Sequence, residues 1–575
     1  MRSIRAGTWL AVGLVACLAR PVPATAGSQW TCRVVALTET NGELGPGIGA
    51  EAYFAWLEAP VLNASGDVAF RAHALVDGIE INGLWRDQGA GPVLVVQGGV
   101  GGGADLGADI GFDPYRYGPQ GSETAGTLPF AANGDLAFRA KLVGEGVDDL
   151  SDTGVWRLGQ AGLTCLAREG AEGTLGPGLG AGLTFTDLYD DTHASLSQGG
   201  YLVFQAKFAG PEVDERSDEG IWVHRDAALQ PVVLEGTDGP LGPQMGPDVV
   251  FTSLGTQCDP AVNSAGQIPF QANLSGPGVT SKNLRGVWRT GPNGLTCILR
   301  TGSDGADGPG LGEGITFTDF YPPTINAHGD VALRAILSSH QVPNGYRGIW
   351  VVDDAGSHLI ARTDTVGDVG PGLGPGVTFH DLKFPLINEG KQIAFGAEIQ
   401  GDGIPSDTWG LWITENGVVK PIALMRTDGA LGPQLGDGAQ FMGIYDPAIN
   451  AGGRVVFFGL VHGGAVVPHG DSEGFWLYDA GRLRCLVRMG DEVDVDPGPG
   501  EDLRVIERIH YLHPASGDTG QGFFLSEDDR LVFSVDFAGI SEAVLVATVP
   551  EPGTAVIALL GVVGLLWRRP RLPRQ

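Results

Sequence analysis

The stretch GPGLGEGITFTDFYPPTINAHGDVALRA, from Gly308 to Ala335, decides the fold because the chain repeats it. GPGLGAGLTFTDLY begins at Gly176, and GPGLGPGVTFHDLKFPLIN begins at Gly370. Each copy opens with a Gly-Pro loop and reaches a Phe six residues after a Leu. Recurrence of one motif with similar internal spacing indicates tandem copies of one supersecondary unit.

Eight such units fill nearly the whole chain. The apolar residue that closes an NxxGxxxF pattern recurs at intervals of 62 to 76 residues: Phe70, Phe138, Phe204, Phe270, Leu333, Phe395, Phe457 and Phe533. Seven of them are followed 15 to 19 residues later by the Trp of a Gly-x-Trp motif: Trp85, Trp156, Trp222, Trp288, Trp350, Trp412 and Trp476. The chain is therefore a repeat protein rather than a set of unrelated domains.

Within a unit the apolar pattern has a period of two, which is typical of strands. In PAINAGGRVVFFG, from Pro447, we expect PAI to be a short first strand and Asn450 to Gly453 a tight turn before the second strand. GFWLYDA and RLRCLVR supply the third and fourth strands, and a Gly-Pro loop leads to the next unit. Four antiparallel strands in each of eight units predict an all-β, eight-bladed β-propeller.

The two ends of the repeat indicate a closed ring. The last unit offers three strands, GFFLS, RLVFSVDF and EAVLVATV, and no fourth. WTCRVVALTE, at residues 30–39, matches the fourth-strand pattern LTCLAREG of Leu163 to Gly170. We therefore expect the N-terminal strand to complete the last blade, an arrangement that a linear solenoid does not need.

Composition and charge narrow the possible partners. The 575 residues include 93 Gly and 43% apolar residues, and no Gly-x-y period suggests collagen. The formal net charge of −31 disfavours nucleic acid and anionic lipid as partners, and favours cations or neutral polar ligands.

The N-terminus reads as an export signal over residues 1–26. Two arginines precede an apolar stretch, and Ala24 and Ala26 form an A-x-A site that places cleavage before Gly27. The LVAC sequence ending at Cys17 also fits a bacterial lipobox, which would make that cysteine the lipid-modified first residue. A single propeller domain would then occupy residues 27–549.

The C-terminal segment, residues 550–575, resembles the PEP-CTERM sorting signal. Pro550, Glu551 and Pro552 are followed by a short apolar run and by a cluster that includes Arg568 and Arg569. The resemblance implies a Gram-negative bacterium that makes exopolysaccharide, removal of the tail by an exosortase, and a cell-surface or matrix location. Membrane contact would then come only through this segment, before processing. The alternative is a plain membrane anchor.

The repeats themselves resemble two known patterns. They are similar to TolB-type propeller blades and to bacterial proteins with tandem NxxGxxAF repeats, which often carry a sorting anchor. Ala131 stands where Asn is expected in unit 2, and Lys391 where Gly is expected in unit 6. The resemblance implies a fold, and a propeller fold does not by itself imply an activity.

The cysteines are predicted to be free. Four of them occupy the same place in the fourth strands of four different units: Cys32, Cys165, Cys297 and Cys485. Equivalent positions of different blades lie too far apart for a disulfide, so we expect the thiols to pack as small apolar side chains.

The strongest candidates for a binding site are carboxylates. Asp187, Asp319 and Asp381 lie in the FTD or FHD element, which we place in the Gly-Pro loops on one face of the ring. Such a ring of carboxylates could hold Ca²⁺ or face a sugar. Alternatively, these residues cap turns, and the neighbouring Phe side chains fill the gaps between blades. The acidic run Gly490 to Asp502 lacks the ligand spacing of a calcium loop and is expected to be a solvated insertion.

No motif of a hydrolase, a metalloprotease or a phosphate-binding loop occurs, and no catalytic residue is predicted. The sequence thus favours an exported binding or scaffold protein associated with exopolysaccharide. The alternative is a polysaccharide lyase or glycoside hydrolase. Its site would lie in the irregular units 2 and 8, around Arg116, Tyr117, His510 and His513.

Overall fold

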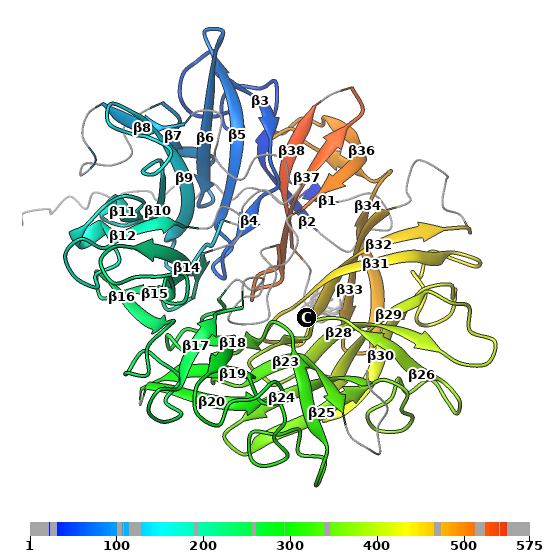
Figure 1. The fold of residues 1–575 in the computed structure, drawn as a ribbon. Helices are drawn as coiled ribbons and strands as arrows, with labels where there is room; N and C mark the ends of the chain where they lie inside the picture. Colours follow the sequence, from blue (N-terminus) through cyan, green and yellow to red (C-terminus); the bar gives the residue numbers. More distant parts are fainter. Residues whose placement is uncertain are drawn as a thin grey trace, which may run out of the picture.

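The fold is a closed ring of β-sheets, as the repeats predict. A computed structural model describes residues 31–99, 106, 109–113, 128–188, 194–255, 260–292, 294–338, 346–464, 473–511, 524–539 and 541–548, and the backbone of Val22–Pro23 (β1). These residues form antiparallel strands and one short 3₁₀ turn, η1 (Gly173–Leu175). Eight sheets follow one another around the ring (Figure 1), which confirms the eight-bladed β-propeller. In the described part of the chain, no helix has the length and apolarity needed to cross a bilayer.

The first four blades follow one another in chain order. Blade 1 contains β3 (Tyr53–Leu57), β4 (Val61–Leu62), β5 (Val68–Val76), β6 (Ile79–Asp87) and β7 (Val93–Gln97). Blade 2 contains β8 (Ile110–Phe112), β9 (Leu136–Gly144), β10 (Thr153–Gly159) and β11 (Gly162–Arg168). Blade 3 contains β12 (Thr184–Asp187), β13 (Ser195–Leu196), β14 (Leu202–Ala209), β15 (Glu219–Arg225) and β16 (Ala228–Leu234). Blade 4 contains β17 (Val250–Ser253), β18 (Pro269–Ser275), β19 (Arg285–Gly291) and β20 (Gly294–Arg300).

The second half of the ring continues in the same way. Blade 5 contains β21 (Thr316–Phe320), β22 (Thr324–Ile325), β23 (Val331–Ser338), β24 (Tyr346–Asp353) and β25 (Gly356–Arg362). Blade 6 contains β26 (Thr378–Leu382), β27 (Leu386–Ile387), β28 (Ile393–Gln400), β29 (Thr408–Glu415) and β30 (Val418–Leu424). Blade 7 contains β31 (Gln440–Ile449), β32 (Val455–His462), β33 (Glu473–Asp479) and β34 (Arg482–Arg488). Blade 8 contains β35 (Glu492–Asp494), β36 (Leu503–His510), β37 (Arg530–Phe537), β38 (Glu542–Thr548) and β2 (Thr31–Leu37).

The innermost strand differs from the sequence-based prediction. The FTD element is itself the first strand of the blade, as in β21 and β26, and is not part of the Gly-Pro loop. The PxI segment is a two-residue continuation, because β22 pairs with the same second strand, β23, as β21 does. In blade 7 the two pieces form one strand, β31. Blade 8 follows the same rule, so its first strand is β36 and not GFFLS.

The repeated Phe, the repeated Trp and the Gly-Pro loop meet in one buried contact within a blade. In blade 5, the indole Nε1 of Trp350 donates a hydrogen bond of 3.2 Å to the Pro309 carbonyl of the Gly-Pro loop. Phe317 packs edge-on against this indole, with 4.9 Å between the ring centroids. A Cβ on Gly348 would lie 2.6 Å from the same ring, which explains the Gly-x-Trp motif. Five other blades show the same Trp-to-Pro bond: Trp85 to Pro46, Trp222 to Pro177, Trp288 to Pro243, Trp412 to Pro371 and Trp476 to Pro433.

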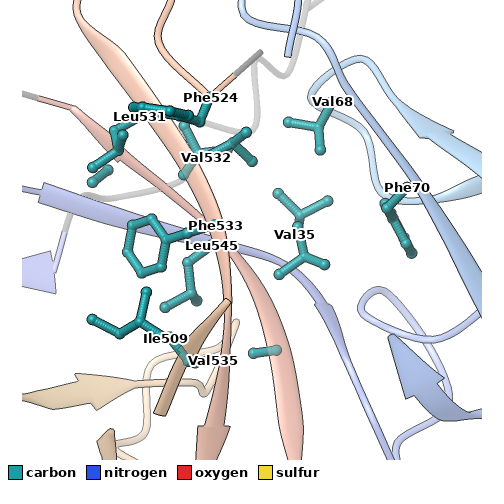
Figure 2. Close-up of a cluster of buried hydrophobic side chains, with 14 of the residues drawn as sticks. Val35, Val68, Phe70, Ile509, Phe524, Leu531, Val532, Phe533, Val535 and Leu545 are labelled. Carbon is teal, nitrogen blue, oxygen red and sulfur yellow. The ribbon is translucent and has the colours of Figure 1, made fainter. Parts of the chain in front are cut away.

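The ring closes where the sequence predicts. β2 pairs antiparallel with β38, and Cys32 lies opposite Ala547. The side chain of Val35 is buried with Phe533 and Leu545 of blade 8 and with Val68 and Phe70 of blade 1 (Figure 2). The N-terminal strand therefore joins the last blade to the first by backbone bonds and by apolar packing.

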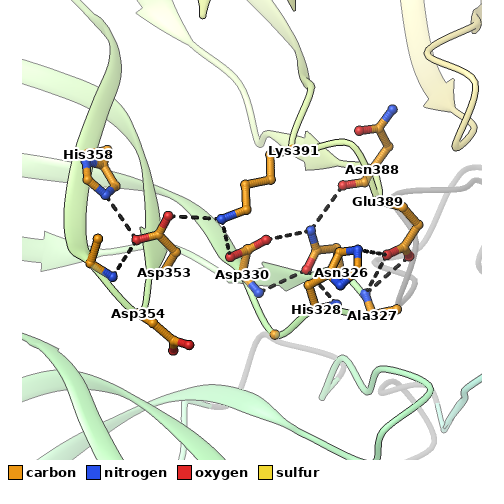
Figure 3. Close-up of polar contacts among 12 residues, drawn as sticks. Asn326, Ala327, His328, Asp330, Asp353, Asp354, His358, Asn388, Glu389 and Lys391 are labelled. Atoms are coloured by element: carbon orange, nitrogen blue, oxygen red, sulfur yellow. Dashed lines mark hydrogen bonds and ion pairs between the residues drawn. The ribbon is translucent and has the colours of Figure 1, made fainter.

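Asn turns connect the first and second strands and also connect neighbouring blades. The Oδ1 atom of Asn326 accepts bonds from the backbone N–H groups of His328 and Asp330, while its Nδ2 donates to the Asn388 carbonyl of blade 6 at 3.2 Å (Figure 3). The turn needs a positive φ at its fourth position, supplied by Gly329 at +86°. Lys391 adopts +58° at the equivalent position of blade 6.

Candidate functional site: an aromatic arc on the inner strands

The predicted ring of carboxylates consists of separate contacts between blades. Asp319, on β21, accepts a bond of 2.5 Å from Arg285 of blade 4 and one of 2.9 Å from the backbone N–H of Phe320. Asp381, on β26, pairs with Arg347 of blade 5 at 2.7 Å and accepts the backbone N–H of Leu382. Each of these carboxylates caps a strand N–H and binds an arginine of the preceding blade.

Asp187 ends β12 in blade 3, so the three candidates lie on the inner strands of blades 3, 5 and 6. In the part of the chain that the structure describes, no three acidic, His or Cys side chains gather as metal ligands would.

Glutamates perform the same capping task at other blade junctions. The carboxylate of Glu542, in blade 8, accepts the backbone N–H of Leu57 in blade 1 at 2.7 Å. Glu169, at the end of blade 2, accepts the backbone N–H of Leu188 at 2.9 Å. Burial raises the pKa of both carboxyl groups, and the accepted N–H bonds oppose that shift. These acidic groups therefore have structural partners.

Of the residues proposed for a catalytic alternative, the structure describes His510. It ends β36, and its Nε2 lies 3.0 Å from Oδ1 of Asp536. The other oxygen of this carboxylate, Oδ2, lies 3.7 Å from Nη1 of Arg508. Its proposed partners Arg116, Tyr117 and His513 lie outside the described residues. The signal cleavage residues Ala24, Ala26 and Gly27 and the sorting residues Pro550, Glu551, Pro552, Arg568 and Arg569 also lie outside them.

The described cysteines are free thiols on the outer strands. Cys165, Cys297 and Cys485 lie directly opposite the tryptophans of their own blades, and Cys32 lies on β2. Burial raises the pKa of Cys32 and of Cys297 to about 12. Thiols with so high a pKa are weak nucleophiles at neutral pH, so these positions do not suggest a reactive cysteine.

The acidic run of residues 490–502 contains β35 and its turn toward β36. The Asp494 carboxylate accepts backbone N–H groups of Asp496 and Asp502, at 3.1 and 2.9 Å, so it organises this turn. Val493 and Val495 are buried in the core of blade 8. The segment is therefore a hairpin with an apolar anchor, and only part of it is solvated.

Exposed apolar side chains concentrate on the inner strands of one part of the ring. Of the thirteen large apolar side chains exposed in the described residues, seven lie on or between the inner-strand segments of blades 6, 7, 8 and 1: Phe384, Met442, Tyr445, Leu503, Val505, Tyr53 and Trp56. The positions equivalent to Trp56 in blades 3, 4 and 5 are Asp187, Ser253 and Asp319. The ring is thus uniform in its core and asymmetric along its inner wall.

We call five aromatic side chains on or beside the inner-strand segments the inner aromatic arc: Tyr321 of blade 5, Phe384 and Trp409 of blade 6, Tyr445 of blade 7 and Trp56 of blade 1. Blade 8, between blades 7 and 1, adds no aromatic ring to it. Phe384 is 50% exposed, and Tyr445 and Trp56 are each 47% exposed. The rings of Tyr321 and Phe384 are 6.0 Å apart, and Trp409 begins β29, which lies against β31, the strand of Tyr445. Grouped exposed apolar side chains are uncommon on soluble proteins and mark interaction sites.

Polar groups accompany the arc. The ammonium group of Lys383 lies 4.5 Å from the Trp409 ring centroid. The hydroxyl of Tyr511, in blade 8, donates a 2.8 Å bond to Asp446, the neighbour of Tyr445. The ring of His73 is 5.1 Å from that of Trp56. The arc therefore offers apolar faces beside hydrogen-bonding groups, the usual composition of a ligand site.

Sequence reasoning missed the arc because its members follow no repeat. Trp56 lies two residues after the inner-strand Phe of its blade, Tyr321 and Tyr445 lie four after it, and Phe384 lies five after it. Treating the FTD element as a loop also hid the strand alternation that would have marked outward-facing positions. The available signal was the aromatic content of these segments in units 1, 5, 6 and 7.

The solved structures to which this chain is similar align with low TM-scores and low identities. The Dos1 propeller aligns with a TM-score of 0.35 and 9% identity, covering 89% of this chain and 94% of its own. An oligogalacturonate lyase in complex with manganese aligns with a TM-score of 0.33 and 12% identity, covering 77% and 97%. Acylaminoacyl peptidase of Pyrococcus horikoshii aligns with a TM-score of 0.33 and 10% identity. That alignment covers 76% of this chain and 52%, about half, of the peptidase.

No curated protein matches the sequence. A family model does match it, over residues 25–375 and 364–556, which together include all eight blades. The chain therefore belongs to DUF7453, a family of unknown function.

Proposed function

We propose that this protein is an exported surface or extracellular-matrix protein that binds exopolysaccharide and does not catalyse a reaction. The observation that supports the proposal is the inner aromatic arc, with three rings about half exposed on the inner strands of blades 6, 7 and 1. Each aromatic ring presents a flat apolar face with a negative quadrupole. The C–H groups on one face of a pyranose ring pack well against such a surface.

The length of the arc suits a polymer better than a single sugar. Its members come from blades 5, 6 and 7 and, beyond blade 8, from blade 1, so a chain of sugars can contact rings on more than one blade. His73, Lys383 and Tyr511 stand beside these rings and offer partners for sugar hydroxyls. Several moderate contacts along one chain add to a useful affinity through effective concentration.

The two ends of the chain supply the proposed location. The signal-like residues 1–26 would direct export across the inner membrane of a Gram-negative bacterium. The PEP-CTERM-like residues 550–575 would be recognised by an exosortase-type enzyme, which is the protein partner that we propose. The propeller lies between these segments, because β2 and β38 close the ring within residues 31–548.

The experiment that tests the proposal measures binding and cleavage together. Protein spanning Gly27 to Val549 would be electrophoresed through gels containing bacterial exopolysaccharides, with and without a calcium chelator. New reducing or unsaturated ends would be assayed in parallel. We expect retention, no new ends, and about fivefold weaker retention for Trp56→Ala or Tyr445→Ala.

Val93→Ala is the matched control, because Val93 is exposed but lies on β7, at the opposite edge of the blade 1 sheet from β3. If both arc variants were retained as strongly as the wild-type protein, that result would contradict a role for the arc. New ends would instead indicate the lyase or glycoside hydrolase. Loss of retention in the presence of the chelator would indicate that binding needs Ca²⁺, with the inner-strand carboxylates as its candidate ligands.

A further inference from the structure

The end of the arc at blades 5 and 6 holds a guanidinium group between two aromatic rings. The Cζ atom of Arg334, on β23, lies 3.6 Å from the ring centroid of Tyr321 and 5.1 Å from that of Phe384. Its Nη1 donates a hydrogen bond to the Leu382 carbonyl of blade 6. A guanidinium stacked in this way is fixed in position and keeps its charge at any physiological pH.

This end of the arc carries three cationic side chains. Asp381 is shared by two arginines, with its Oδ1 2.7 Å from Arg347 and 3.8 Å from Arg334. Lys383 adds a third cation over the Trp409 ring, and no carboxylate of the described residues lies within ion-pair distance of it. Glu398, opposite Asp381 and Trp409 in the sheet, is the second acid here.

Asp381 and Glu398 are the acids beside these three cations, and the backbone N–H of Asp407 bonds to Glu398, so a third carboxylate lies nearby. The chain as a whole carries −31, so a cationic group beside exposed aromatic rings is unusual for this surface. The nearest equivalent junction, between blades 4 and 5, holds one arginine and one carboxylate, Arg285 and Asp319, and is neutral.

The two arginines are only partly accessible to a ligand. The Nε atoms of Arg334 and Arg347 are buried, and no residue that the structure describes accepts a bond from either of them. Arg334 itself is 9% exposed. A ligand cannot reach these buried Nε atoms, so a ligand carboxylate would bind the exposed ammonium group of Lys383 and the side chain of Arg347, which is 39% exposed.

We infer that the Arg334–Lys383–Phe384 end of the arc recognises the carboxylate of an acidic sugar, so that the polysaccharide bound is one that contains uronic acid residues. The inference rests on the proposed function, and it names the ligand class of the same site. Phe384, half exposed, supplies the apolar face for the sugar ring, and Lys383 with the arginine pair supplies the charge. A net acidic protein repels a polyanion at long range, so the cationic end also fixes where such a chain can bind.

The test uses three polymers and protein from Gly27 to Val549. Alginate is a polymer of uronic acids, alginate with esterified carboxyl groups is its neutral counterpart, and dextran is an unrelated neutral glucan. We expect alginate to bind at least tenfold more tightly than its ester, and Lys383→Gln and Phe384→Ala each to weaken alginate binding about tenfold. Lys282→Gln is the matched control, because Lys282 is exposed in a loop of blade 4 and its loss changes the net charge equally.

Each outcome separates the inference from the function on which it rests. Equal binding of alginate, its ester and dextran would overturn the inference and leave the proposed function standing. Alginate binding that both site variants leave at the wild-type level would also overturn it, because the acidic polymer would then bind elsewhere. Failure of all three polymers to bind, with folded protein confirmed by circular dichroism, would count against the proposed function itself.

Discussion

Glu235 shows how a single residue can set the pH dependence of this fold. It follows β16 in blade 3, is buried, and lies close to the carboxyl group of Glu219. Burial, together with the charges of Glu219 and Asp218, raises the pKa of Glu235 from 4.5 to about 8. At neutral pH the folded protein therefore holds this group protonated, whereas the unfolded chain ionises it.

This difference determines the sign of a testable effect. As the pH rises from 4.5 to about 8, the folded state retains a proton that the unfolded state releases, so the free energy of unfolding falls. Glu235→Gln removes that loss, because an amide stays neutral. We expect the variant to match the wild type near pH 5 and to be about 2 kcal/mol more stable at pH 8.5. Denaturant unfolding at the two pH values measures the effect.

Glu215→Gln is the control for the lost carboxylate, because Glu215 is exposed in the loop between β14 and β15. The free energy of unfolding should depend less steeply on pH in Glu235→Gln than in the wild type. Some dependence should remain, since burial also raises the pKa of Glu169, Glu389 and Glu473. An unchanged slope between pH 5 and 8.5 would show that Glu235 titrates normally in the folded protein.

At the scale of elements, the Asn turn explains why the blades stay together. In blade 6, Oδ1 of Asn388 accepts the backbone N–H of Gln392 at 2.8 Å, and its Nδ2 donates to the Asn450 carbonyl of blade 7 at 3.0 Å. The side chain therefore closes its own turn and binds the next one. Because Asn388 is fully buried, water cannot replace either bond.

Asn388→Ala should accordingly cost about 2–4 kcal/mol, since it leaves buried backbone groups without partners. Urea unfolding measures the cost. Asn273→Ala is the comparison, because Asn273 lies on β18 and makes no side-chain hydrogen bond among the described residues. Equal costs for the two substitutions would mean that the bond between turns contributes nothing beyond the change in side-chain size.

One departure from the turn pattern shows how a blade compensates. Lys391 takes the positive φ that glycine adopts in most other blades, and its ammonium group binds Asp330 at 2.9 Å and Asp353 at 3.0 Å (Figure 3). The bonds to Lys391, and those from Ala355 and His358, lower the pKa of Asp353 to about 2 despite its partial burial. A strained backbone is thus accompanied by an ion-pair network between blades 5 and 6.

For the whole molecule, the sequence was sufficient for the blade count and the closure, because seven of the eight blades repeat the same buried contact between a Phe and a Trp. The spacing of these residues therefore marks each of the seven blades, and the closing residue Phe533 marks the eighth. The inner strand was misassigned because its two pieces are separated by a break but pair with one second strand. The arc was not predictable from the repeat, because its aromatic side chains lie outside the buried contacts that the blades share and are therefore free to differ.

The closure allows a direct test of the whole ring. Cys32 of β2 and Ala547 of β38 face each other in the sheet, 515 positions apart in the chain. Ala547→Cys should therefore form a disulfide with Cys32 that links the two ends of the folded chain. Burial raises the pKa of Cys32 to about 12, so the thiolate is scarce in the folded protein. The bond should form during refolding in a glutathione redox buffer rather than by oxidation of the native state.

A cross-link over so long a loop should stabilise the ring by about 2–4 kcal/mol, measured by denaturant unfolding with and without reductant. Thr548→Cys is the matched control, because successive residues of a strand point to opposite faces, so this side chain lies on the other face from that of Ala547. A disulfide in Thr548→Cys and none in Ala547→Cys would place β2 one residue out of register. No disulfide in either, with both proteins folded, would mean that the N-terminal strand does not close the last blade.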